Sequence, residues 1–145
     1  MYIDSNLILS TAQAITVAAT STYYIDMLST GFGHNDELYA QFYVDTSFTI
    51  TSGASITLTI MLGNETTFAS TSVAVMKTVL WNSTTASSGY LLATMHIGPD
   101  VYKQDGDNPF RYLYATYALP GGAVSAGKID ARLVKDIDMT MDKVL

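Results

Sequence analysis

The sequence predicts an all-β protein, folded as an antiparallel β-sandwich or barrel. Three observations support this prediction. Apolar and polar residues alternate along most of the chain, which is the period of a half-buried strand. Turn-forming residues recur at roughly 8- to 15-residue spacing, as in proteins whose short strands are joined by tight connections. Ser and Thr together supply 32 of the 145 residues, and their side chains suit the polar face of a sheet.

The alternation places about seven to nine short strands along the chain. Residues 55–62 are the clearest, because four large apolar residues alternate with Ser, Thr and Met between Gly53 and Gly63. Residues 7–19 are predicted to be extended with a turn, since the β-branched residues there disfavour a helix. The other predicted strands cover residues 23–28, 38–44, 71–80, 89–97, 110–118 and 124–137, and residues 46–51 either continue the strand of residues 38–44 or begin the next one.

Length and charge limit the class of protein. A chain of 145 residues predicts a single domain, residues 1–145, that can bury its own core. The net charge is −6 and the first basic residue is Lys77, which argues against a nucleic-acid partner. No apolar run has the length of a membrane helix, and the start lacks the pattern of a signal peptide, so no membrane association is expected. The absence of Cys excludes disulfides and thiolate chemistry.

The residues that could perform chemistry form no recognisable motif. His34 lies in a Gly-rich turn and His96 near the end of an apolar strand, and neither has neighbours at metal-ligand spacing. Residues 100–107 are acidic like a calcium loop but lack its spacing. Four carboxylates show no evident pairing for glycoside chemistry: Asp26, Glu37, Asp45 and Glu65. The sequence therefore predicts no catalytic residue, no metal and no cofactor, and a protein that is not an enzyme.

Aromatic residues are the remaining candidates for binding. Tyr112, Tyr114 and Tyr117, together with Phe110, would form either a carbohydrate platform or cross-strand packing. Trp81, the only tryptophan, is either an exposed contact anchor or a cap over the edge of the core.

Several segments, taken in order, resemble the capsid cement (decoration) proteins of tailed bacteriophages, of the Bordetella-phage type. The segments that carry the resemblance are Ile3–Thr16 with its Ser-Thr-Ala-Gln-Ala block, Tyr24–Met27, Glu37–Tyr39, Ser55–Leu62, Phe110–Tyr114 and Gly127–Ile137. The resemblance covers nearly the whole chain. Residues 139–145 form a short C-terminal tail that runs past the usual end of the family.

The resemblance implies a jelly-roll-like β-sandwich that binds the outer surface of an assembled phage head. Such a protein clamps neighbouring capsid subunits, so the expected partners are the major capsid protein and other copies of the chain, in a homodimer or homotrimer. The implied location is the outside of the head, assembled in the host cytoplasm. The composition of the chain is consistent with this function, because a clamp needs rigid β-structure and large neutral surfaces but no cofactor.

Four residues are the predicted capsid or oligomer contacts. Tyr2, Ile3 and Leu7 belong to an N-terminal arm, residues 1–10, whose apolar side chains would otherwise be exposed at a terminus. The alternative is that these residues form the first strand of the sandwich. Trp81 is the fourth candidate.

A second function is compatible with the same fold. A carbohydrate-binding jelly roll for host-surface adhesion would need an exposed aromatic platform and a bound calcium ion. Its support in the sequence is limited to the tyrosines of residues 110–118 and the acids of residues 100–107.

Overall fold

The computed structural model describes residues 7–27, 38–50, 55–64, 73–81, 85–97, 104–105, 108–119 and 127–134. All regular structure longer than a single turn in these ranges is β-strand. The longer strands are β1 (Ile8–Ala14), β4 (Leu38–Thr46), β6 (Ser55–Gly63), β7 (Val73–Trp81), β9 (Leu91–Ile97), β12 (Tyr112–Ala118) and β13 (Lys128–Val134). The short strands are β2 (Ala19–Thr20), β3 (Ile25–Asp26), β5 (Phe48–Thr49), β8 (Thr85–Ala86), β10 (Gln104–Asp105) and β11 (Asn108–Pro109).

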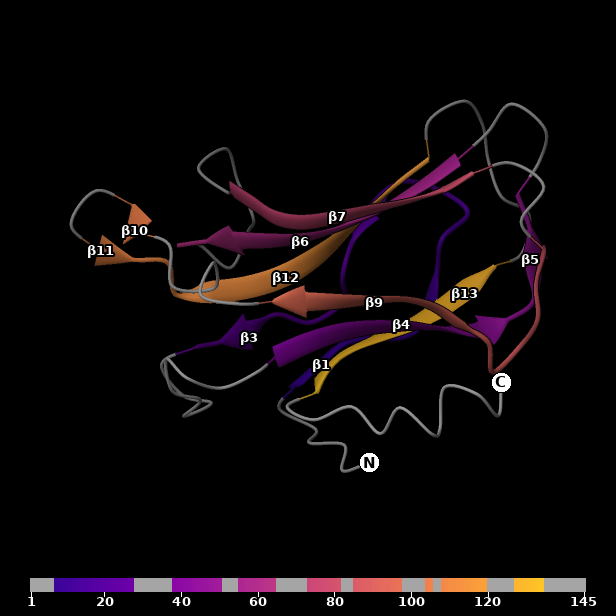
Figure 1. Cartoon of the computed structure of the whole chain (residues 1–145), viewed down its shortest axis with the longest axis horizontal. Helices are drawn as coiled ribbons and strands as arrows, with labels where there is room; N and C mark the ends of the chain where they lie inside the picture. The colour runs from indigo at the N-terminus through magenta and orange to yellow at the C-terminus, as the bar shows by residue number, and fades with distance from the viewer. Residues whose placement is uncertain are drawn as a thin grey trace.

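The longer strands form two antiparallel sheets that face each other (Figure 1). One sheet, here called sheet A, has the order β1-β13-β4-β9. The other, sheet B, has the order β2-β12-β6-β7, with β3 also paired to β12. The short strands β2 and β3 both lie along β12 and together fill one position of sheet B. With these two taken together, and apart from the separate pairs β5-β8 and β10-β11, the described strands alternate between the two sheets along the chain, except that β6 and β7 are consecutive in sheet B. This order is that of a jelly roll, in which two Greek keys fold into a double layer. The predicted antiparallel jelly-roll-like sandwich is confirmed.

The alternation seen in the sequence is what fills the space between the sheets. On β6, Ile56, Leu58, Ile60 and Leu62 are all fully buried, and the intervening residues point outward. A single hydrophobic cluster contains residues from strands of both sheets. Among them are Leu113, Ala115 and Tyr117 from β12, Ala40, Phe42 and Val44 from β4, and Ile129, Ala131 and Leu133 from β13. The Tyr117 and Phe42 rings pack edge to face, with their centroids 6.2 Å apart. The two sheets thus share one continuous core.

The boundaries of several predicted strands differ from the structure. Residues 23–28 contain only the two-residue β3, because the chain leaves β12 at Ser21 and crosses toward β1. Phe48 and Thr49 do not continue β4 but form β5, which pairs with β8. The last strand covers 128–134 within the predicted 124–137, and its flanks lie outside the described residues. Residues 7–19 are extended with a bend, as predicted.

Strand β1 carries two extra residues relative to its partner β13. Ile8 lies opposite Arg132, whereas Gln13 lies opposite Ile129, so five steps along β1 match three along β13. Ala12 sits in the second of these irregularities with a φ of 45°, a left-handed conformation that is unfavourable for Ala. The Asp130 carboxylate stabilises it, since its Oδ1 atom accepts a 2.6 Å hydrogen bond from the Ala12 N–H.

A chain of polar contacts connects the two sheets beside these bulges. The Tyr117 hydroxyl of sheet B lies 2.7 Å from Ser10 Oγ of sheet A, and Ser10 Oγ donates to Gln13 Oε1 over 2.5 Å. Since Ser10 has one hydroxyl proton, Tyr117 is the donor to Ser10. Gln13 also accepts from the Thr22 N–H and donates from Nε2 to the Thr20 carbonyl. Every bond has one donor and one acceptor, so the orientation of the Gln13 amide is fixed.

We expect Tyr117→Phe to lower the free energy of unfolding by about 1 kcal/mol at neutral pH, because it leaves Ser10 without its buried donor. It should also flatten the alkaline loss of stability. Burial raises the pKa of Tyr117. In the unfolded chain the Tyr117 hydroxyl ionises near pH 10. Its contribution to the free energy of unfolding is therefore complete below pH 10 and falls by about 1.4 kcal/mol per pH unit above it.

Urea unfolding of the wild type and of Tyr117→Phe at pH 7 and at points above pH 10 would measure both effects. Tyr90→Phe is the matched control, because it removes the hydroxyl of an exposed tyrosine. Parallel alkaline curves for the wild type and Tyr117→Phe would contradict the prediction.

A second prediction concerns the close contact between Gly127 and Phe48. A Cβ atom at position 127 would lie 3.0 Å from the Cβ, Cγ and Cδ1 atoms of Phe48, a buried core residue. We expect Gly127→Ala to destabilise the fold by about 1–3 kcal/mol through overpacking. Thermal unfolding would measure this, and the smaller Phe48→Leu should recover part of the loss in the double variant. Additive losses in the double variant would show that the contact is not the cause.

Candidate functional site

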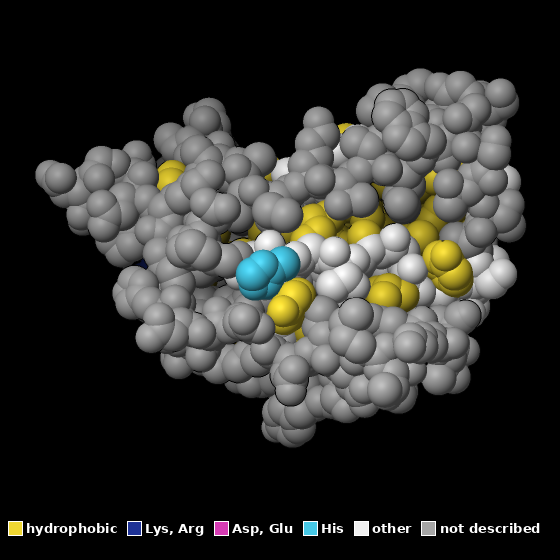
Figure 2. Space-filling view, viewed as in Figure 1, with side chains coloured by type: hydrophobic (Ala, Val, Ile, Leu, Met, Phe, Trp, Pro, Cys, Tyr) yellow, Lys and Arg dark blue, Asp and Glu magenta, His cyan; other side chains and the backbone are white. Residues whose placement is uncertain are grey.

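The residues considered for catalysis do not assemble in the structure. His96 is exposed on β9, with its ring 4.9 Å from that of Tyr39 on the neighbouring β4 (Figure 2). Asp26 is engaged in an ion pair with Arg111, and Asp45 accepts a hydrogen bond from its neighbour Thr46. Within the described ranges, no three His, Asp or Glu side chains come together as metal ligands. The other candidates considered from the sequence lie outside the described residues: His34, Glu37, Glu65 and most of residues 100–107.

The three tyrosines of β12 do not form the carbohydrate platform considered from the sequence. Tyr114 and Tyr117 are 2% and 1% exposed, and they point to opposite faces of the strand. Tyr117 is in the core between the sheets, where its hydroxyl meets Ser10. Of the four aromatic residues, Phe110 is also buried, so only Tyr112 is accessible. A period-two pattern cannot distinguish a covered outer face from an open one, so the sequence left both alternatives open for Tyr114, and its burial excludes the platform.

Tyr112 belongs to a smaller polar and aromatic corner at the end of sheet B. Its ring packs edge-on against Tyr24, with the centroids 5.1 Å apart, and the Arg111 guanidinium lies 5.1 Å from its centroid. Arg111 also binds Asp26 with two hydrogen bonds, Nε to Oδ1 at 3.0 Å and an η-nitrogen to Oδ2 at 2.7 Å. The hydrogen bond to Asp26 raises the pKa of Arg111. The fork-like pair fixes the guanidinium, so its charge is already matched within the chain.

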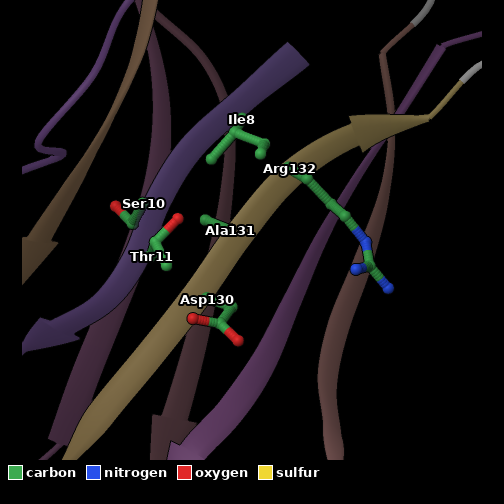
Figure 3. A pocket seen from close by; sticks show the side chains of 6 residues that line it. All are labelled: Ile8, Ser10, Thr11, Asp130, Ala131 and Arg132. Atoms are coloured by element: carbon green, nitrogen blue, oxygen red, sulfur yellow. The ribbon is translucent and has the colours of Figure 1, made fainter. Parts of the chain in front are cut away.

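A cavity of about 170 Å³ lies between β1 and β13, on the outer face of sheet A. It is lined by Ile8, Ser10, Thr11, Asp130, Ala131 and Arg132. Figure 3 shows the Ile8 and Thr11 side chains on β1 and the Asp130 side chain on the neighbouring β13, while the Arg132 side chain extends away from β1. The guanidinium of Arg132 lies over the Tyr43 ring, with Cζ 4.3 Å from the centroid. Its Nε is buried and has no hydrogen-bond partner among the described residues.

This cavity is not among the sites predicted from the sequence. A signal was present, since Lys128, Asp130 and Arg132 alternate with apolar residues and therefore point outward from one strand. What the sequence could not indicate is that β1 lies beside them with two extra residues, which is a feature of the pairing between distant segments.

The four predicted contact residues have different outcomes. Tyr2 and Ile3 lie outside the described residues, and their role stays a prediction. Leu7 is only 6% exposed and belongs to the hydrophobic core of its own chain, so it is not available as an exposed contact. Trp81 is the last residue of β7 and lies opposite Ser55. Among the described strands, β7 is at one edge of sheet B. Strand β1 begins at Ile8, so residues 8–10 of the predicted arm are part of sheet A.

No helix in the described ranges is long and apolar enough to span a membrane. No curated protein matches the chain. A family model, Bbp16, matches residues 9–133, a span that runs from the first long strand to the last. The chain therefore belongs to the Bbp16 family, a family of Bordetella-phage proteins.

Proposed function

We propose that this protein is a virion structural protein that binds the outer surface of an assembled phage head and clamps neighbouring capsid subunits. The observation that carries the proposal is the family match over residues 9–133, which covers strands of both sheets. The partners in this proposal are the major capsid protein and further copies of the chain, as a homodimer or homotrimer. The location is the outside of the head.

The chemistry of the surface supports a contact function. Thr20, Thr116 and Thr59 lie side by side on three neighbouring strands of sheet B, on the face opposite the core. On the same face Thr57 lies opposite Ala118. Such neutral side chains cost little to desolvate compared with charges, so they suit a surface that is covered on assembly.

The rigidity of the sandwich supports a clamp. One shared core joins the sheets, and no described segment divides it into separate parts. A rigid protein that touches several subunits holds them at fixed separation, because moving one subunit strains every contact at once. Multivalent attachment then lets modest individual interfaces give tight overall binding. Neither a metal nor a cofactor is needed for this work.

The test is co-sedimentation of the purified protein with expanded phage heads that lack it, after light scattering has given the mass of the free protein. We expect saturable binding at a fixed number of copies per capsid subunit, and heads that resist heat better. At a free concentration of 100 times Kd, each occupied site is stabilised by about 2.7 kcal/mol. Unexpanded heads are the comparison for the dependence on capsid conformation.

A stable oligomer that ignores expanded heads would contradict the proposal. If that oligomer bound immobilised glycans with a calcium-dependent rise in Tm, the carbohydrate-binding alternative would replace it. Silence in both glycan and calcium assays would remove that alternative.

A further inference from the structure

We propose that the cavity between β1 and β13 receives a basic side chain, lysine or arginine, from a capsid subunit, with its charged group on the Asp130 carboxylate. This inference rests on the proposed function and names one contact through which the head would be bound. The cavity has a charged group, an apolar lining and an opening to the surface, and each of these bears on the choice of occupant.

The charged group is a carboxylate that forms no ion pair with any residue the structure describes. Asp130 Oδ1 accepts from the Ala12 N–H, and no described group bonds the second oxygen, Oδ2. The two bases on the same strand and face, Lys128 and Arg132, form no ion pair with it in the described part of the chain. Arg132 instead lies over Tyr43, on the side away from β1. A half-buried carboxylate in this state favours a cation.

The lining suits the rest of a long basic side chain. Ile8, which lies opposite Arg132, supplies apolar surface to the cavity, and Thr11 supplies a hydroxyl. Lys and Arg have a hydrocarbon stem that packs on apolar surface while the head group reaches a polar one. A bare metal ion would need several oxygen ligands, and among the lining residues Asp130 is the only carboxylate.

The site is held in place before anything binds. The bulges of β1 and the hydrogen bond from Ala12 fix the Asp130 carboxylate, whose Oδ1 is 2.6 Å from the donor nitrogen. Fixed groups lose little conformational entropy on binding, so the interaction energy is not spent on ordering them. The chain carries a net charge of −6, which attracts a basic surface at longer range.

The test compares Asp130→Asn with Asp45→Asn in the head-binding assay. Asn keeps an oxygen to accept from the Ala12 N–H, so the bulge is preserved while the charge is lost. Asp45 is the matched control, because it is a half-buried aspartate on neighbouring β4 that lies outside the cavity. Both variants change the net charge equally. We expect Asp130→Asn to weaken binding about tenfold or more relative to Asp45→Asn, most strongly at low salt.

Carbodiimide cross-linking identifies the base directly. The reagent activates the Asp130 carboxyl, a lysine amine attacks the carbonyl carbon, and the activated group leaves as a urea, so an amide forms between the two chains. We expect a mass-spectrometric peptide pair linking Asp130 to a capsid lysine, absent in Asp130→Asn. Loss of affinity without a cross-link would assign the base as arginine, whose guanidinium does not form this amide.

The outcomes separate the inference from the function beneath it. If the wild type binds heads and Asp130→Asn binds as tightly as Asp45→Asn, the cavity is not the contact, and the proposed function stands without it. If the wild type does not bind heads, both fail together. Thermal unfolding of the two variants ensures that any loss of binding is compared between folded proteins.

Discussion

The contact on which this sandwich depends is polar and lies at the edge of its core. The Tyr117 hydroxyl belongs to sheet B and Ser10 to sheet A, and the 2.7 Å bond between them ties the layers where strand β1 is most irregular. Apolar packing alone allows two sheets to slide, because it has no preferred direction. A directional bond inside the interface does not, since breaking it leaves buried polar atoms unpaired. Gln13 extends this constraint to the backbone of residues 20 and 22.

Charged side chains are paired differently on the two sheets. At the end of sheet B, Arg111 and Asp26 neutralise each other in a fork-like pair, and further along the same sheet Thr20, Thr116 and Thr59 lie side by side. On sheet A, Asp130 and Arg132 stay unpaired with one another although they are two residues apart on one strand. The charges of Arg111 and Asp26 are already paired within the chain, whereas the charge of Asp130 is not paired with that of Arg132. A binding surface that selects by charge is therefore better placed on sheet A.

Much of the fold could be predicted from the sequence, and the limits have physical causes. The alternation in residues 55–62 predicts strand β6 because every second residue is required by the core. Leu7 and Tyr114 could not be placed, since burial of a strand's outer face or of a terminus depends on what packs there. The cavity could not be predicted from the sequence for a similar reason. Asp130 is visibly outward in the pattern, but the neighbour that makes it part of a site, Ile8, is 122 residues away.

The irregularity of β1 also decides how copies of the protein behave when crowded. A regular free strand at the edge of a sheet offers evenly spaced N–H and C=O groups to any similar strand, and sheets can then grow from one molecule into the next. Two extra residues and a left-handed Ala12 break that spacing along β1. The Leu9 carbonyl of β1 is in addition already bonded to the Tyr23 N–H. The geometry of the backbone itself therefore disfavours edge-to-edge growth through this side, without the use of charge.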